Sequence, residues 1–132
     1  MAAGASPLTS NDAVSAYVAA WGEPDDEARR ELLERAWADD GLYCDPLATV
    51  VGRDALVAHI GGFRERMPGH RIVLTTVVDE HDGWLRFGWR ILDASGAPAL
   101  DGLDVGELGP DGRLRRIVGF FGPLAPAEEA AA

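Results

Sequence analysis

The sequence predicts an α+β fold in which three N-terminal helices pack on a curved antiparallel sheet and enclose a pocket. Apolar residues recur with a helical period in the first half of the chain, and this period changes to 2 after Pro68 and Gly69. The strand-like segments that follow are separated by glycine-containing turn sequences, which is typical of an antiparallel meander. A sheet of four long strands has to curl or be covered, and helices can cover only its concave side. We therefore expect a cone with a cavity between the helices and the sheet.

Three helices are predicted from apolar stripes at helical spacing and from the residues that can begin or end them. Ser10 or Asn11 can cap the first helix, and residues 22–24, Gly-Glu-Pro, end it. The acidic pair at residues 25–26 begins the second helix at its positive end. The third helix is expected over residues 53–67. The three buried stripes consist of Val14, Tyr17, Val18 and Trp21; of Leu32, Leu33, Ala36 and Trp37; and of Leu56, His59, Ile60, Phe63 and Met67.

A short extended segment is predicted at residues 42–45, after the second helix. Pro46 disfavours helical geometry at the residue before it, so Tyr43 and Asp45 are expected to project from the same side. In the second half of the chain, apolar and polar residues alternate most clearly over residues 84–92. The four long strands of the predicted sheet are residues 70–79, 84–92, 99–108 and 113–121.

Asp104 is the most informative residue, because it interrupts a segment that otherwise reads as a buried strand. Gly102 and Gly106 lie on the same face of that strand. A carboxylate in an apolar layer costs free energy unless it is hydrogen-bonded, neutralised or used, and the glycines remove the side chains that would fill the space beside it. This pattern predicts that Asp104 faces a ligand pocket. Two alternatives remain: an ion pair with an arginine such as Arg116, or a register shifted by one residue that turns Asp104 outward.

Length and charge limit the classes of function. A chain of 132 residues can form one domain with its own core; we expect that domain over residues 11–124, after a disordered lead at residues 1–10 and before a flexible tail at residues 125–132. The net charge of −10 argues against nucleic acid and membranes as partners, because both need a basic face. All twelve basic residues are arginines, which excludes Schiff-base chemistry by a lysine.

No metal or other cofactor is expected. Cys44 is the only cysteine, so the chain has no internal disulfide and no thiolate cluster. The three histidines, His59, His70 and His81, lie far apart and lack the spacing of a metal site. A lone cysteine fits a reducing compartment, and we expect a cytoplasmic protein.

Two carboxylates and a phenol can converge on the expected cavity. Asp45 ends the extended segment, Asp104 lies in mid-strand, and Tyr17 lies on the inner stripe of the first helix. Such a set suits acid–base chemistry on a carbonyl compound. Taken singly, Asp45 before a proline is a common turn residue, and Tyr17 is typical of a packed aromatic with its hydroxyl at a rim. The substrate-binding walls are expected to include His59, Phe63, Trp89, Phe121 and Trp37.

Five short motifs contain or accompany these residues: Tyr17-Val18-Ala19-Ala20, Cys44-Asp45-Pro46, Gly102-Leu103-Asp104, Gly109-Pro110-Asp111-Gly112-Arg113 and Phe120-Phe121-Gly122. In their order along the chain they resemble ketosteroid isomerase, within the nuclear-transport-factor-2-like (NTF2-like, or SnoaL-like) superfamily, although the interval from Tyr17 to Asp45 is longer by about one helical turn. The resemblance covers about residues 11–122, nearly the whole chain, and it implies the cone-shaped NTF2-like fold.

The resemblance also implies roles and partners. Asp45 matches the general base of ketosteroid isomerase, and Tyr17 and Asp104 match the two donors of its oxyanion hole. In that enzyme an aspartic acid is kept neutral by its apolar site so that it can donate a hydrogen bond. The implied activity is a cofactor-free isomerisation of a small hydrophobic carbonyl compound, steroid-like or polyketide-like. A homodimer is implied through the outer face of the sheet, where Trp84 and Phe120 are expected to form an apolar patch.

Two other functions remain open. An epoxide hydrolase of the limonene-epoxide-hydrolase type would have the same fold and paired aspartates, but it needs an arginine that bridges two carboxylates in the cavity, for which Arg86 and Arg90 are the candidates. A module that only binds a hydrophobic ligand, or only dimerises, would use the same cone with Asp104 paired structurally.

Overall fold

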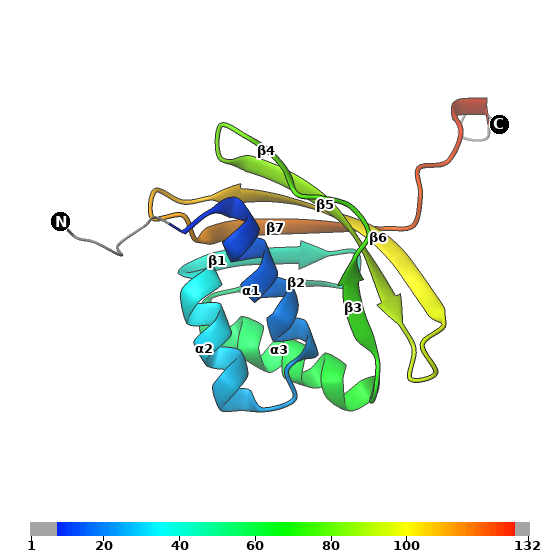
Figure 1. The fold of residues 1–132 in the computed structure, drawn as a ribbon, viewed down its shortest axis with the longest axis horizontal. Coiled ribbons are helices and arrows are strands. Elements are labelled where there is room, and N and C mark those ends of the chain that lie inside the picture. Colours follow the sequence, from blue (N-terminus) through cyan, green and yellow to red (C-terminus); the bar gives the residue numbers. More distant parts are fainter. Residues whose placement is uncertain (1–7, 129–132) are drawn as a thin grey trace.

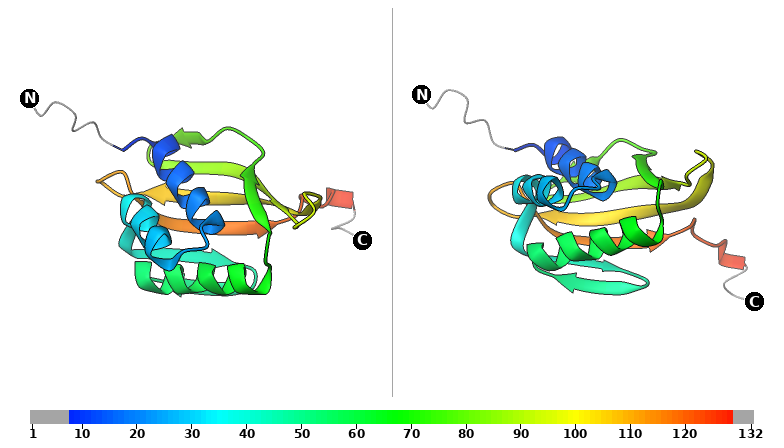
Figure 2. Two further views of the ribbon diagram at one scale, coloured as in Figure 1. Left: turned by 60° about the horizontal axis from the view of Figure 1, so that its bottom comes forward. Right: turned by 90° about the horizontal axis from the view of Figure 1, so that it is seen from below.

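The computed structural model describes residues 8–128 and has the α+β architecture that the sequence predicts. Three helices, α1 (Ser10–Gly22), α2 (Asp26–Ala36) and α3 (Arg53–Arg66), lie on one side of a curved sheet (Figures 1 and 2). The strands are β1 (Trp37–Asp45), β2 (Ala48–Val51), β3 (Arg71–Leu74), β4 (Asp79–His81), β5 (Trp84–Leu92), β6 (Pro98–Leu108) and β7 (Leu114–Phe121). Their order in the sheet is β2-β1-β7-β6-β5-β3, and β4 also pairs with β5. Most of the expected lead and half of the expected tail, residues 1–7 and 129–132, lie outside the described residues.

The starts of α1 and α2 are set by side chains that cap free backbone N–H groups, whereas α3 begins after Gly52 without a side-chain cap. The first cap is Thr9, not Ser10 or Asn11 as predicted: its hydroxyl accepts from the Asp12 N–H at 3.0 Å, and the Asp12 carboxylate accepts from the Thr9 N–H in return. This reciprocal pair gives a hydrogen-bond acceptor to two backbone N–H groups. It is therefore more favourable than a single cap at the next residue, which would satisfy one. α2 begins at the acidic pair as predicted, and Asp25 caps it by accepting from the Ala28 N–H at 2.9 Å.

The sheet is mixed, whereas a purely antiparallel sheet was predicted. β1 is antiparallel to β2 but parallel to β7, and it is longer than the predicted segment at residues 42–45. Residues 39–41, Asp-Asp-Gly, interrupt the alternation of apolar and polar residues near the start of this strand, so the sequence pattern did not indicate its full length. β2 was not predicted; it forms because the carboxylate of Asp45 accepts from the N–H groups of Leu47 and Ala48 and so reverses the chain within two residues.

The predicted strand over residues 70–79 is two strands. Between β3 and β4 the chain leaves regular pairing, yet Thr75 donates its N–H to the Gly88 carbonyl at 2.9 Å and the Thr76 hydroxyl accepts from the Gly88 N–H at 2.8 Å. A Cβ atom at Gly88 would lie 2.6 Å from the Thr75 hydroxyl, so this close approach needs glycine. The strand over residues 84–92 is confirmed, and its hairpin with β4 turns at Asp82 and Gly83, which both have positive φ.

Arg29 is a buried charge that joins the helices. Its side chain is 1% exposed, and it donates to the carbonyl oxygens of Glu23 and Pro24 at 2.8 and 3.2 Å and to that of Val57 in α3 at 3.4 Å. It also pairs with the Asp26 carboxylate at 2.6 Å. The guanidinium thereby donates to two carbonyl groups in the connection between α1 and α2, to a carboxylate at the start of α2 and to one carbonyl group of α3. None of the helices in the described residues is long and apolar enough to cross a membrane.

The outer face of the sheet carries Trp84 and Phe120, which were expected there, and also Leu103, which was not predicted. Trp84, Leu103 and Phe120 are 45%, 38% and 54% exposed, and Leu103 and Phe120 are directly paired across β6 and β7. They alternate with the inward-facing residues of the same strands. The homodimer expected through this face stays a prediction.

We expect Arg29→Leu to lower the free energy of unfolding by about 3 kcal/mol, because it leaves several buried carbonyl groups without a donor. Urea unfolding followed by tryptophan fluorescence measures the change. Arg30→Leu is the matched control, because Arg30 pairs with Asp54 on the surface and its loss should barely move the unfolding midpoint. Equal changes in the free energy of unfolding for the two variants would contradict the role of Arg29 as the donor that joins the helices.

For the predicted homodimer, Phe120→Glu should shift the chain toward monomer, because it places a charge in the apolar surface. Light scattering coupled to size exclusion measures the mass. Val77→Glu is the control, since Val77 is 83% exposed but lies outside the outer-face strands. A wild-type chain that is monomeric throughout would contradict the dimer.

Candidate active site

A pocket of 360 Å³ lies between the helices and the inner face of the sheet. Tyr17, Asp45 and Asp104 all line it, so the structure brings together the three residues predicted to carry the chemistry. The predicted wall residues His59, Phe63, Trp89 and Phe121 line it too. The other wall residues are mostly apolar, for example Ile72, Phe87, Ile91 and Leu100.

Trp37 does not line this pocket, contrary to the prediction. Its indole is fully buried behind Tyr17, with the two rings stacked at 5.6 Å. The reason lies in its own strand: a Cβ atom at Gly41 would be 2.4 Å from the Trp37 ring nitrogen, so the ring folds back over Gly41. Trp37 therefore packs against the face of the Tyr17 ring, on the side away from the pocket.

Asp104 lies in the middle of β6 and faces inward, 6% exposed. Its Oδ1 accepts a hydrogen bond from the Trp89 ring nitrogen at 2.8 Å. Burial raises the pKa of Asp104 to about 7; the Trp89 hydrogen bond lowers the pKa, and the charge of Asp45 raises it further. On the neighbouring strand, a Cβ atom at Gly119 would lie 2.8 Å from Oδ1, so the carboxyl group occupies space that only glycine leaves.

The space beside Asp104 is filled by protein, which corrects the interpretation of its flanking glycines. A Cβ atom at Gly102 would lie 2.0 Å from the Trp89 ring, and one at Gly106 would lie 2.8 Å from Ile117. The glycines admit large neighbouring side chains and do not themselves form a vacancy for a ligand. The partner of Asp104 is Trp89, and not Arg116 as one alternative had it.

Asp45 is both a turn residue and a pocket residue. Its Oδ1 accepts from the backbone N–H groups of Leu47 and Ala48 at 2.8 and 2.9 Å, and its Oδ2 accepts from the Tyr43 hydroxyl. All three partners are donors, so the carboxylate serves only as an acceptor and is held in one orientation.

Tyr43 was not among the predicted site residues, although the alternation of β1 places it on the same side as Asp45. Burial, and then the hydrogen bond to Asp45, raise the pKa of Tyr43 above its usual range. The phenol therefore keeps its proton and remains a donor. The period-2 spacing from Asp45 was the signal that could have included it.

Tyr17 enters the pocket from α1 and is 2% exposed. Burial raises the pKa of its phenol well above the usual value, and the charge of Asp104 adds to the shift. Trp21 meets its ring edge-on at 6.4 Å, while Trp37 stacks on it. A neutral phenol held between two aromatic rings is a fixed hydrogen-bond donor.

His59 and Arg66 bring α3 into the pocket wall. His59 packs against Trp21 at 6.0 Å and Tyr43 at 5.4 Å between ring centres. Burial lowers the pKa of His59, the charge of Asp45 opposes that shift, and Arg66 adds to it. Arg66 was not predicted as a site residue, because its place near the end of a helix carries no sequence signal of its own.

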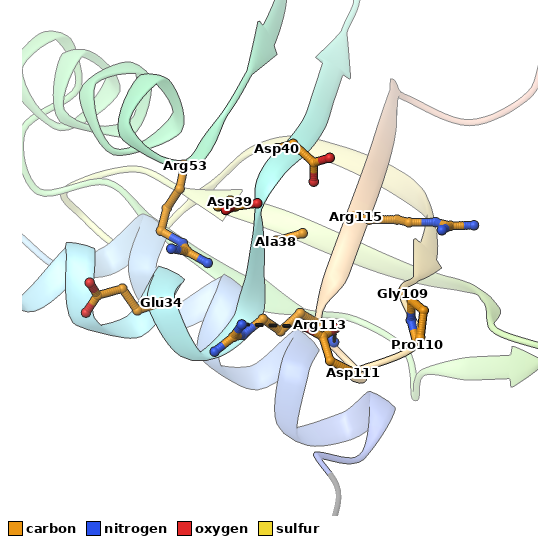
Figure 3. A pocket seen from close by; sticks show the side chains of 10 residues that line it. All are labelled: Glu34, Ala38, Asp39, Asp40, Arg53, Gly109, Pro110, Asp111, Arg113 and Arg115. Carbon is orange, nitrogen blue, oxygen red and sulfur yellow. Dashed lines mark hydrogen bonds and ion pairs between the residues drawn. The ribbon is translucent and has the colours of Figure 1, made fainter.

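A second, larger hollow of 740 Å³ lies at the β6–β7 hairpin and the start of β1, and it is lined largely by charged side chains (Figure 3). Its arginines have partners within the chain: Arg113 pairs with Asp111 at 3.4 Å, and Arg53 donates to the Trp37 carbonyl at 2.6 Å. None of the predicted site residues lines this hollow. Among the described residues no group of His, Cys, Asp or Glu could hold a metal ion.

The two arginines that were the candidates for an epoxide-hydrolase site lie elsewhere. Arg86 pairs with Asp79 at 2.8 Å and Arg90 with Asp101 at 2.7 Å, and all four side chains are substantially exposed. Neither arginine lines the pocket of Asp45 and Asp104. The two candidates for a bridging arginine therefore do not bridge these acids.

The comparisons with known proteins agree with this architecture. A crystal structure from Agrobacterium tumefaciens, of a SnoaL-like family protein for which an isomerase activity has been suggested, is 38% identical, covers 84% of this chain and 95% of its own, and has a TM-score of 0.80. A suggested polyketide cyclase from Sinorhizobium meliloti (17% identity, 82% and 93% coverage, TM-score 0.65) and an NTF2-like protein of unknown function from Cytophaga hutchinsonii (13%, 90% and 95%, 0.66) share the fold.

None of the curated proteins matches the chain. The family model of the SnoaL-like domain matches residues 14–117, which include most of the helical layer and almost all of the sheet. With that match and the likeness to the Agrobacterium tumefaciens structure, this chain belongs to the SnoaL-like domain family.

Proposed function

We propose that the chain is a cofactor-free acid–base enzyme that moves a proton from the α to the γ carbon of a small hydrophobic, steroid-like or polyketide-like carbonyl compound. The observation that carries the proposal is that Tyr17, Asp45 and Asp104 line one apolar pocket of 360 Å³. The isomerase activity suggested for the Agrobacterium tumefaciens relative supports the same reaction class.

In this proposal Asp45 is the general base. Its carboxylate removes the α proton of a β,γ-unsaturated ketone, and the electron pair of the broken C–H bond moves onto the carbonyl oxygen to give a dienolate. Asp45 then returns the proton to the γ carbon, and the double bond shifts into conjugation with the carbonyl group. The Tyr43 hydroxyl and two backbone N–H groups hold the carboxylate in place through this sequence.

Tyr17 and Asp104 stabilise the dienolate oxygen by hydrogen bonds. Tyr17 stays neutral because burial raises its pKa. Asp104 donates only in its neutral form, which burial favours below about pH 7. Two donors fixed in a mostly apolar pocket contribute more to such an oxyanion than the same donors in water.

Aldol ring closure of a polyketide-like substrate begins with the same proton removal, and a polyketide cyclase activity has been suggested for one structural neighbour. Both reactions need the same base and the same oxyanion donors. They differ in whether the new bond of the product is C–H or C–C, which nuclear magnetic resonance and absorbance spectra of the product distinguish, because neither reaction changes the mass of the substrate.

Asp45→Asn should lower kcat on a β,γ-unsaturated ketone by about three orders of magnitude, because an amide cannot take the proton. The rate is measured from the absorbance of the conjugated product, and binding of an uncharged phenol should survive. Asp40→Asn is the matched control, since Asp40 lies on the same strand outside this pocket. Unchanged turnover by Asp45→Asn removes the base from the proposal; a wild type that binds phenols without turnover supports the ligand-binding alternative.

We expect kcat/KM to fall as the pH rises through about 7. The donor is the protonated form of Asp104, which is present below its pKa of about 7 and is lost above it. Asp104→Asn keeps a permanent N–H donor at the same position, so its pH profile should lack this alkaline fall. A wild-type profile that stays flat from pH 6 to about 9 would contradict the role of Asp104 as a neutral donor.

A further inference from the structure

Trp89 is held in place from three sides. Its indole lies over Gly102, where a Cβ atom would be 2.0 Å from the ring. Phe121 meets it edge-on, with ring centres 6.0 Å apart and planes at 88°. Its ring nitrogen donates to Oδ1 of Asp104 at 2.8 Å in a buried setting. The indole N–H therefore points at one oxygen of the acid and has little freedom to turn away.

The chemistry of this hydrogen bond distinguishes the two oxygens of Asp104. An indole N–H is a donor only, so Oδ1 has to act as an acceptor in both protonation states. In a carboxylic acid the carbonyl oxygen is the stronger acceptor, so the indole stabilises the tautomer whose proton is on Oδ2. Oδ2 has no hydrogen-bond partner among residues 8–128 and is not sealed off from the pocket that Asp104 lines.

We propose that Trp89 is a positioning residue, which occupies Oδ1 of Asp104 and thereby places the acid's proton on Oδ2, where it can reach a ligand oxygen in the pocket. The use of that proton in catalysis rests on the proposed function. Its placement does not, and it is measurable without turnover.

The groups that face Asp104 limit what else can titrate in the same range. β1 contributes Asp45 and Tyr43, α1 contributes Tyr17, and α3 contributes His59 and Arg66 to the same pocket. The inward residues paired with Asp104 on β5 and β7 are Phe87 and Gly119, which carry no charge. Both phenols keep their protons because their pKa values are raised. His59 is the group whose titration has to be separated from that of Asp104.

Nuclear magnetic resonance of the indole N–H groups tests the hydrogen bond directly. The chain has four tryptophans, and the signal missing from Trp89→Phe identifies Trp89. We expect this signal to shift with a midpoint near pH 7, because the acceptor changes from a carboxylate to a carbonyl oxygen as Asp104 gains its proton. The shift should vanish in Asp104→Asn and persist in His59→Gln.

A Trp89 signal that does not titrate, or that titrates unchanged in Asp104→Asn, overturns the proposal. Loss of the titration in His59→Gln alone also overturns it. None of these outcomes depends on an enzymatic rate, so the result stands whether or not the chain proves to be an isomerase.

Binding of 2-naphthol, an uncharged phenol at these pH values, tests whether the proton is aimed at the ligand. If only protonated Asp104 donates, the wild-type Kd should be about tenfold weaker at pH 8 than at pH 6 for a midpoint near 7. In Trp89→Phe the affinity at pH 6 should fall roughly tenfold, the loss of about one hydrogen bond. The pH of the fall should also move upward, because the indole no longer stabilises the anion.

Phe63→Leu is the control for this experiment, because Phe63 lines the same pocket and makes no hydrogen bond to Asp104. It should weaken binding without moving the midpoint. Should Trp89→Phe fail to fold, replacement of Trp89 by its benzothiophene analogue removes the N–H and keeps the shape. An unchanged midpoint and affinity in either variant overturns the proposal. Absence of 2-naphthol binding in the wild type instead counts against the proposed function, while the resonance experiment still decides the role of Trp89.

Discussion

The pocket depends on one buried carboxyl group and on the space that the sheet leaves around it. Asp104 can stay inside the apolar layer because the Trp89 indole donates to it and because Gly119 leaves room for its oxygen. Trp89 in turn needs the bare backbone of Gly102. A methyl group at either glycine would collide with this pair, so acid, indole and glycines form one unit across three strands.

Asp45 combines two tasks that a sequence presents as alternatives. The same carboxylate that reverses the chain between β1 and β2 also faces the pocket, where Tyr43 donates to its second oxygen. A turn residue is rigid because backbone groups fix it, and rigidity is also what a proton-transfer group needs. The turn interpretation and the functional interpretation of Asp45 are therefore compatible in this fold.

Local sequence patterns predicted much of the fold and the convergence of the site. They did not predict the features that depend on contacts between distant parts of the chain. Alternation over residues 84–92 and the apolar stripes of the helices identified the inner faces of these elements. This was enough to predict that Tyr17, Asp45 and Asp104 share one pocket, as the structure has them. The parallel pairing of β1 with β7 was missed because strand direction depends on the path of the whole chain. The Trp89–Asp104 hydrogen bond was missed because periodicity places residues on a face without specifying which of them touch. Trp37 was misplaced for the same reason.

The position of β7 in the sheet has a consequence for synthesis of the chain. β7 is the last strand of the described residues and lies between β1 and β6, so until it leaves the ribosome no strand pairing can join one half of the sheet, β2–β1, to the other, β6–β5–β3. Each half then presents an unpaired strand edge, which is a template for pairing with other nascent chains. The half with β1 carries Asp45 and the half with β6 carries Asp104, so the two acids first face a common chamber when the final strand docks.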